Sequence, residues 1–301
     1  MAVLDRYQAG KVALLADGSV PGGVTFAFTE RTGGVSQGCH ASLNLGDACG
    51  DEPSRVAENR RLALAAIGAA AWAGSLVAPH QVHGDHVVRV TSAEPEELLA
   101  RRREAREGAD AVVCTVPHVP ALLCFADCVP VVVCAPGGFA VAHSGWRGTI
   151  ARIGAKAARA LMDETGCAAE ELRAYVGPHI CAEDYEVSSE LMERFVGEFG
   201  PAVDAGGRHL DLGLAVRAAL VETGVPEGSI ASCDDSTASN VGRFFSYRAE
   251  KGRCGRHAAL AVLGSDAREG KNTFMALYGL ERCGAYVHEL SEQAAAAVDG
   301  A

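Results

Sequence analysis

The stretch that decides the fold is GFAVAHSGWRGT, residues 138–149, in which an apolar run gives way to a glycine-rich turn. The apolar residues up to His143 predict a buried strand, and Gly145 and Gly148 permit positive φ or close backbone approach. Strand ends beside helix N-termini are common ligand sites in α/β folds. His143 is therefore a candidate ligand-binding residue.

Two further side chains of this turn are suited to binding. Trp146 can stack on a planar ring, and Arg147 can hold an anion. A tight turn with a packing tryptophan explains the same residues equally well. The stretch alone therefore leaves both interpretations open.

Working outward, short apolar runs separated by Pro or Gly predict strands of a sheet buried on both faces: AVVCTV (111–116), ALLCFADC (121–128), VVVCA (131–135) and FAVAHS (139–144). Apolar residues at helical spacing predict helices after Thr149 as N-cap, within Val187–Phe199, within Leu212–Leu220 before Gly224, and over Ser54–Ala70. Strands and helices interleave without strict alternation. The fold class expected is mixed α/β or α+β, with helices packed outside sheets.

Composition narrows the class of protein. The chain has 301 residues, enough for one large domain or two modest ones, with 49% hydrophobic and 22% charged residues. Its net charge of −11 argues against a nucleic-acid groove, which needs clustered Lys and Arg. No apolar run is long enough to cross a bilayer, and the first residues do not resemble a signal peptide. A cytoplasmic location is expected.

The cysteine pattern also favours a cytoplasmic location. There are 11 of them without a CxxC pair, which argues for a reducing compartment rather than a disulfide framework. FADCVP (125–130) places Cys128 beside Asp127 where an apolar strand ends. A thiol there can be a nucleophile or a soft metal ligand, although a buried core cysteine is the commoner case.

HQVHGDH (80–86) carries three histidines, His80, His83 and His86. If the segment is extended, His83 points away from the other two, so one face offers only part of the set to a metal. A surface loop with solvated histidines explains the segment without any site.

Taken together, two histidines and one cysteine can bind Zn²⁺ and leave a fourth position open for water, the catalytic pattern. The same residue types also occur in blue-copper sites and in Cys–His nucleophile pairs. The residues lie far apart in the sequence, so their types alone leave these alternatives open.

Read as a set, the motifs resemble one family closely: the multicopper polyphenol oxidases of laccase type, now regarded as zinc-dependent purine nucleoside phosphorylases and also known as peptidoglycan editing factors. The matching pieces keep the family's order from about residue 21 to 263: TERTGGVSQG (29–38), SLNLG (42–46), ENRRL (58–62), QVHG (81–84), ADCVPV (126–131), VAHSGWRGT (141–149), GPHICAEDYEV (177–187) and FFSYR (244–248).

The resemblance implies a metal held by His83, Cys128 and His143. It implies Zn²⁺ as the cofactor, with copper as an adventitious occupant. It also implies a four-layer α/β/β/α fold with mixed sheets, of the cysteine-hydrolase-like toxin fold group, and a monomer.

The implied activities are phosphorolysis of adenosine, inosine, guanosine and methylthioadenosine, and deamination of adenosine. The partners are thus a small nucleoside and phosphate, without nucleic acid or membrane. Candidate catalytic residues are Cys128, His143 and Asp127. Arg31, Arg147 and Arg248 are candidates for an anion clamp. Asn44, Gln81 and Asp127 are candidates for ribose or base contacts.

Rival functions remain. A four-copper oxidase needs HxH pairs, and the chain has 10 histidines and no such pair, although one copper ion could occupy the His–Cys–His site. A Cys–His hydrolase acting on misincorporated peptidoglycan precursors would use Cys128 as nucleophile and His143 or His83 as base. A non-catalytic zinc or nucleoside-binding module would bind without turnover.

The expected domain organisation is one catalytic domain over residues 1–264 and an appended, helical tail over 265–301. Two segments depart from the family pattern. Phe125 stands where a small polar residue is common, and CDDSTASN (233–240) differs before FFSYR. These departures bear on substrate preference more than on metal binding.

Overall fold

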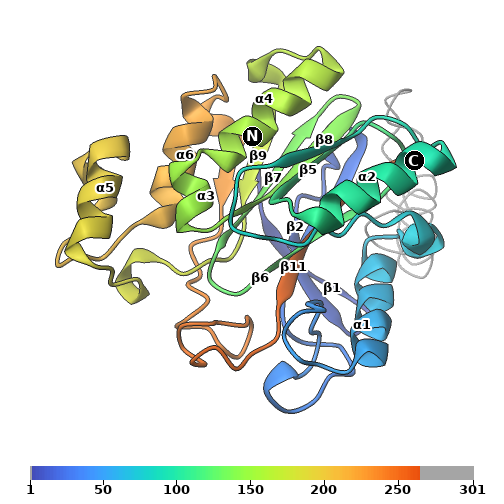
Figure 1. Cartoon of the computed structure of the whole chain (residues 1–301), viewed down its shortest axis with the longest axis horizontal. Coiled ribbons are helices and arrows are strands. Elements are labelled where there is room, and N and C mark those ends of the chain that lie inside the picture. Colours follow the sequence, from blue (N-terminus) through green and yellow to red (C-terminus); the bar gives the residue numbers. More distant parts are fainter. Residues whose placement is uncertain (1, 265–301) are drawn as a thin grey trace, which may run out of the picture.

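The apolar runs form strands in two separate sheets within residues 2–264, the part of the chain that this computed structural model describes (Figure 1). The first sheet is antiparallel throughout, with strand order β1 (Asp5–Ala9), β2 (Val12–Ala16), β3 (Val24–Thr29), β11 (His257–Leu263) and β6 (Ala121–Phe125). The second is mixed, with order β10 (Ile230–Ser232), β9 (Arg173–Val176), β7 (Val129–Ala135), β8 (Gly138–Ser144), β5 (Ala111–Cys114) and β4 (Val87–Val90). Its two outer pairs are parallel and its central pairs antiparallel.

Strand β8 shows how the sequence produces this packing. Its residues are all buried, and they alternate between two cores because successive side chains of a strand point to opposite faces. Ala140 and Ala142 belong to the core shared with helices, whereas Phe139 and Val141 belong to the core between the two sheets. His143 falls on the same alternation as Phe139 and Val141. Its imidazole therefore points into the space between the sheets.

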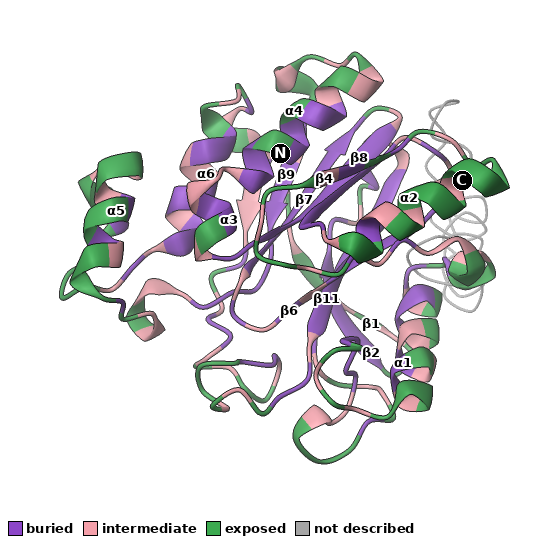
Figure 2. Ribbon diagram, viewed as in Figure 1, coloured by how far each residue is buried: buried purple, intermediate pink, exposed green. Residues whose placement is uncertain are grey.

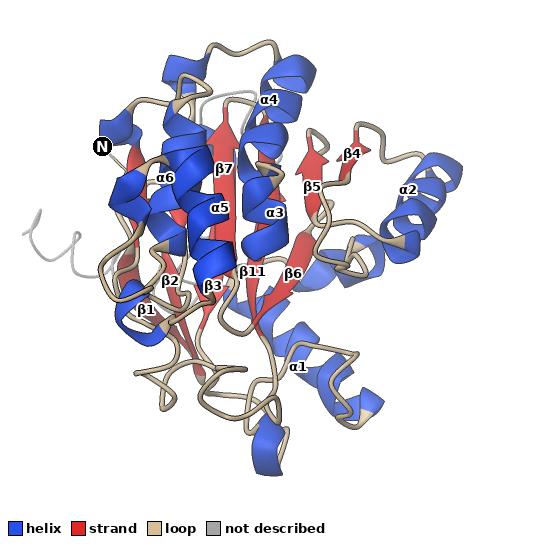
Figure 3. Ribbon diagram, turned by 60° about the vertical axis from the view of Figure 1, so that its left-hand side comes forward, coloured by secondary structure: helices blue, strands red, loops and turns tan. Residues whose placement is uncertain are grey.

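Helices cover the outer faces of the two sheets, except α2, which lies beside the edge strand β4 (Figure 3). Helices α4 and α6 pack on the six-stranded sheet and share a core with α5, whereas α1 packs on the five-stranded sheet. Figure 2 shows the inner strands buried and the outward faces of the helices exposed, whereas β1, at the edge of its sheet, has no buried residue. The helix bounds are α1 (Pro53–Ala66), α2 (Pro95–Glu107), α3 (Trp146–Ile150), α4 (Ile153–Thr165), α5 (Ser189–Phe199) and α6 (Leu212–Val221).

The mixed α and β composition and the four expected helices are confirmed, but two details of the expectation are wrong. The four central runs do not form one sheet: β6 pairs with β11 in the five-stranded sheet, whereas β5, β7 and β8 lie in the other. Thr149 is not an N-cap. It lies inside α3, where its hydroxyl donates to the Gly145 carbonyl, and α4 starts afresh after Arg152 with φ 58°.

Smaller differences concern where elements end. The helix expected over Ser54–Ala70 stops at Ala66, and Gly68 follows with φ 73°. The strand expected over 111–116 ends at Cys114. The ten cysteines in residues 2–264 are all free thiols. Within that range no helix is both long and apolar enough to cross a membrane. The helical tail expected over 265–301 lies outside the described residues.

Candidate metal centre

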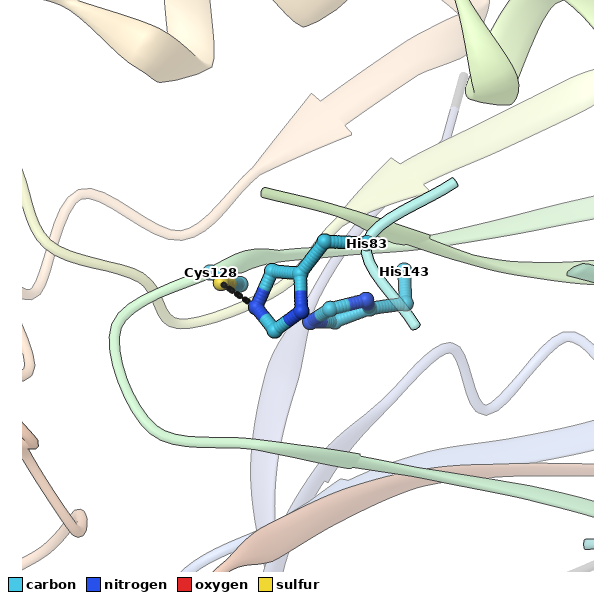
Figure 4. Close-up of side chains that lie close together, drawn as sticks. All are labelled: His83, Cys128 and His143. Atoms are coloured by element: carbon cyan, nitrogen blue, oxygen red, sulfur yellow. Dashed lines mark hydrogen bonds between the residues drawn. The ribbon is translucent and has the colours of Figure 1, made fainter. Parts of the chain in front are cut away.

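Three side chains from distant parts of the chain converge where the central strands β7 and β8 of the six-stranded sheet begin and end (Figure 4). His83 comes from the loop before β4, Cys128 from the connection between β6 and β7, and His143 from the end of β8. Their candidate ligand atoms all lie within 4.8 Å of one another. The Sγ atom of Cys128 is 3.8 Å from Nε2 of His83, and the two imidazole rings meet edge to face.

One buried carboxylate organises this cluster. Asp110 accepts a hydrogen bond from Nδ1 of His143 at 2.8 Å. It also accepts the backbone N–H groups of Val82, His83 and Gly84 at 3.1, 3.0 and 2.7 Å. Because Asp110 binds Nδ1, it is Nε2 of His143 that is turned toward the cluster, and this nitrogen can bind a metal once its proton is lost. The three amides hold the loop in the turn in which His83 adopts φ 60°.

Electrostatics favour the ligating form of the thiol. Burial raises the pKa of the Cys128 thiol, but the charge and hydrogen bond of His143, together with His83, outweigh burial and bring the pKa down to about 6. Burial lowers the pKa of His143, but Cys128 and Asp110 together outweigh it and raise the pKa to about 9. Cys128 is therefore a thiolate at neutral pH, which is the species that binds metals and attacks electrophiles.

Gly145 leaves the room that the cluster needs. A Cβ atom at this position would lie 2.9 Å from Cδ2 of His83 and 3.0 Å from Sγ of Cys128. Both distances are shorter than van der Waals contact allows. The glycine after the β8 strand is thus required by the cluster beside it, in addition to the turn that it begins.

The donor set fits a borderline-soft metal ion. Two imidazole nitrogens and one thiolate suit Zn²⁺ or copper, whereas Mg²⁺ and Ca²⁺ prefer oxygen. On a tetrahedral Zn²⁺, nitrogen and sulfur ligands are separated by about 3.6 Å. The distance of 3.8 Å between Cys128 and His83 is close to that value. The Asp110–His143 hydrogen bond supplies the outer contact typical of such sites.

The cluster opens into a cavity of about 520 Å³, within the size range of small-molecule sites. A smaller cavity of about 220 Å³ shares His83, Asp127 and Cys128 with the first and adds Trp146 and Arg147. The three candidate ligands therefore stand where a small molecule in the larger cavity can reach them.

Among the candidate substrate residues, Gln81, Asp127 and Arg248 line the larger cavity. The Gln81 amide is fixed at both ends by the backbone of Cys124, at 2.7 and 2.8 Å. The carboxylate of Asp127 accepts the Thr237 hydroxyl and the Arg248 backbone N–H, each at 2.7 Å. Structural hydrogen bonds therefore set the positions of Gln81 and Asp127.

The other candidates lie elsewhere. Arg147 lines the smaller cavity, with its guanidinium 4.9 Å from the Trp146 ring centroid. Arg31 and Asn44 are not among the described residues that line either cavity. Arg31 donates to the carbonyls of Ala41 and Val241 and pairs with Glu250, so its guanidinium holds loops together.

Of the three close histidines, only His83 joins Cys128 and His143. His80 lines the cavity wall, and His86 pairs with Glu104 on the surface. Residues 80–86 do not form the extended strand considered from the sequence, because the backbone turns at His83, where φ is 60°.

Sequence reasoning missed several residues. Asp110 directly precedes the apolar strand β5, and an acid at that position was a usable signal. Arg60 lies within the ENRRL motif but had no role assigned. Tyr247 lies within the FFSYR motif, again without an assigned role, and Arg256 lines the cavity without any local pattern that marks it.

The comparisons with known proteins agree with one another. The family described as multi-copper polyphenol oxidoreductase laccase matches residues 25–264. A protein of Deinococcus radiodurans named purine nucleoside phosphorylase is 38% identical over 255 residues, covering 82% of this chain and 92% of that protein. Adenosine deaminase RL5, from an unknown prokaryotic organism, is 32% identical over 234 residues, covering 74% and 87%. The crystal structure of YlmD from Geobacillus stearothermophilus superposes with a TM-score of 0.75 at 27% identity, covering 86% and 99%.

Proposed function

The chain belongs to the multi-copper polyphenol oxidoreductase laccase family, and we propose that it is a zinc-dependent purine nucleoside phosphorylase that also deaminates adenosine. The observation that carries the proposal is the convergence of His83, Cys128 and His143 in the wall of a cavity of about 520 Å³. Relatives named for these two activities support it.

Zinc is proposed rather than a copper cluster because of the number of donors. The described residues contain one group of His, Cys and acidic side chains close enough to hold a metal, and it has three members. Three protein ligands with an open position are the catalytic zinc pattern, whereas a multicopper centre needs many more histidines. A single copper ion at the same donors is the adventitious case, because Cu²⁺ binds most such sites more tightly. When bound, Zn²⁺ supplies Lewis acidity and lowers the pKa of water toward neutrality.

The chain's own residues would bind and orient the nucleoside. Tyr247 is exposed at the cavity and offers a ring on which a purine can stack. Arg248, with its guanidinium 5.2 Å from the Tyr185 ring centroid, places a positive charge in the wall beside Asp127. Asp110 would keep His143 in the ligating tautomer during turnover.

A second candidate function, that of a Cys–His hydrolase, rests on one observation. A thiolate with a pKa of about 6 beside an imidazole is also the arrangement of a Cys–His hydrolase, with Cys128 as nucleophile and His143 as base. Metal ligation and nucleophilic attack compete for the same sulfur. The two functions are therefore separable by experiment.

We also propose how the layers of the fold are arranged. Three cores, between α1 and the first sheet, between the sheets, and between the second sheet and α4–α6, support a four-layer α/β/β/α arrangement of the cysteine-hydrolase-like toxin group. We take residues 1–264 as one catalytic domain that acts as a cytoplasmic monomer.

The test is a product analysis. The protein, purified without added copper and with its metal content measured, is incubated with adenosine or inosine, with and without phosphate, and products are resolved by chromatography. Phosphate-dependent release of adenine or hypoxanthine, lost in His83→Ala and Cys128→Ser, supports the proposal. The matched controls His86→Ala, from the same loop, and Cys39→Ser, an exposed thiol, should keep activity. A zinc-loaded protein with no turnover would refute it.

A further inference from the structure

Two arginines in the wall of the large cavity have no part in the assignments above. Arg60 comes from α1 and Arg256 directly precedes β11, so they lie far apart in the sequence. Both line the cavity that contains the metal centre, together with Gly46 and Asp47.

One short segment holds both arginines in place. Leu45 donates its backbone N–H to the Arg256 carbonyl at 2.9 Å, and its own carbonyl accepts Nε of Arg60 at 2.9 Å. The buried side chain of Asn44 accepts the backbone N–H of Arg256 at 2.8 Å. The guanidinium of Arg60 and the backbone of Arg256 are therefore held by the same short segment, residues 44–45.

Gly46 belongs to this arrangement. A Cβ atom at Gly46 would lie 2.7 Å from Cγ of Arg256, so glycine is what lets the arginine stem pass. Nη1 of Arg256 donates to the carbonyls of Cys254 and Gly255 at 2.9 and 2.8 Å. Its side-chain hydrogen bonds within residues 2–264 all come from Nη1, its Cζ lies 5.8 Å from the Tyr247 ring centroid, and no carboxylate in that range lies within ion-pair distance. Arg256 therefore presents an uncompensated positive charge at the cavity.

Arg60 is only weakly paired. Its Nη2 is 3.4 Å from Asp47, a side chain that is 42% exposed and also pairs with Arg106. Nε of Arg60 donates to the Leu45 carbonyl, and the stem of Arg256 passes close to the adjacent Gly46. The two arginine side chains therefore reach the cavity wall beside neighbouring residues of one segment.

We propose that Arg60 and Arg256 form the seat for inorganic phosphate in phosphorolysis, an inference that rests on the function proposed above. Arginine presents paired N–H donors that match phosphate oxygens, and such charge-assisted hydrogen bonds are strong. A chain with net charge −11 repels anions overall, so a phosphate needs a local concentration of positive charge.

The reaction that this seat serves is balanced as follows. A phosphate oxygen forms a bond to C1′ of the ribose, and the C1′–N9 bond breaks with its electron pair passing to the purine. The purine nitrogen takes up the proton that the attacking phosphate hydroxyl loses. The products are the free base and ribose 1-phosphate.

The kinetic test compares Arg60→Met and Arg256→Met with Arg61→Met. Methionine keeps an unbranched stem and removes the charge. Arg61 is the neighbour of Arg60 on α1 but pairs with Glu58 at the surface, so it is a matched control. We expect the KM for phosphate to rise by about tenfold or more in the first two variants and to stay unchanged in Arg61→Met. Phosphorolysis at low phosphate should fall relative to phosphate-independent deamination of adenosine.

A direct measurement separates this inference from the function on which it rests. Equilibrium dialysis of the metal-loaded proteins against radiolabelled inorganic phosphate, without nucleoside, should show binding in wild type and Arg61→Met and its loss in Arg256→Met. If wild type turns over no nucleoside, the proposed function fails and dialysis alone decides the phosphate seat. Unchanged phosphate KM and Kd in both cavity variants would overturn the inference. The inference would also be overturned if Arg256→Met changed the turnover of adenosine 5′-monophosphate but left the binding of inorganic phosphate unchanged.

Discussion

The carboxylate of Asp110 accepts a hydrogen bond from Nδ1 of His143 at 2.8 Å, and the same carboxylate holds the loop that carries His83. Two of the three candidate ligands therefore depend on one buried side chain. This relationship connects the segment before β5, the end of β8 and the loop before β4.

Asp110→Asn should weaken metal binding by about 10- to 100-fold, as loss of an outer-sphere partner does at other metal sites. The amide lacks the charge that favours the Nδ1–H tautomer and accepts backbone N–H groups less strongly. Competition with a metal chelator measures the affinity. Asp163→Asn, at an exposed carboxylate, is the control. Equal affinity in the two variants would show that Asp110 does not position the ligands.

Gly145→Ala should lower the metal content and the activity while the protein stays folded. The added Cβ atom would press on His83 and Cys128 at about the distances given above, so the cluster must open. Gly197→Ala, at a glycine of α5 with no atom within 4 Å of the new Cβ, should keep full metal content. Metal analysis and circular dichroism provide the comparison. Full metal occupancy in Gly145→Ala would contradict the geometry of the cluster.

Removal of the metal should make Cys128 reactive. With its pKa near 6, the free thiol is a thiolate at pH 7, whereas ligation occupies the same sulfur. We expect iodoacetamide to modify Cys128 rapidly after chelation and slowly in the metal-loaded protein, as mapped by peptide mass spectrometry. The exposed Cys39 should react in both states. Rapid modification of Cys128 in the metal-loaded protein would favour the hydrolase instead.

His257→Leu should flatten the acid side of the stability profile. Burial lowers the pKa of His257 to about 3 and outweighs the Pro178 backbone carbonyl, which favours the charged ring. Between the unfolded pKa of about 6.5 and the folded value, the unfolded chain binds a proton that the folded chain does not. Stability from this residue is therefore complete above about pH 6.5 and is lost as the pH falls toward 3.

Denaturant unfolding of wild type and His257→Leu from pH 7 to pH 4 measures this effect. The difference in unfolding free energy should change in favour of the variant by up to about 1.4 kcal/mol per pH unit below about pH 6. Acidic groups such as Glu30 also destabilise the fold at low pH, but they are common to both proteins and cancel. Parallel curves for the two proteins would rule out the contribution of His257.

The comparison of sequence and structure is clearest at β8. The alternation of Phe139, Val141 and His143 was visible in the residues themselves, because side-chain direction in a strand follows from local geometry. The same holds for the apolar stripe of α5 and for the family, which follows from motif order. Sheet membership was not visible, because β6 and β7 are both short apolar runs and nothing local says that the chain changes sheet between them.

The sequence by itself determined the buried strands, the helices, the family and the three residues that the family's motifs point to. Only the tertiary structure decided that His83 joins Cys128 and His143, that Asp110 holds two of them, and that Arg256 rather than Arg31 faces the cavity. The physical reason is the distance along the chain over which each effect acts. Backbone preference and hydrophobic alternation act between near neighbours, whereas a binding site is made by side chains that strand pairing and sheet packing bring together from distant segments.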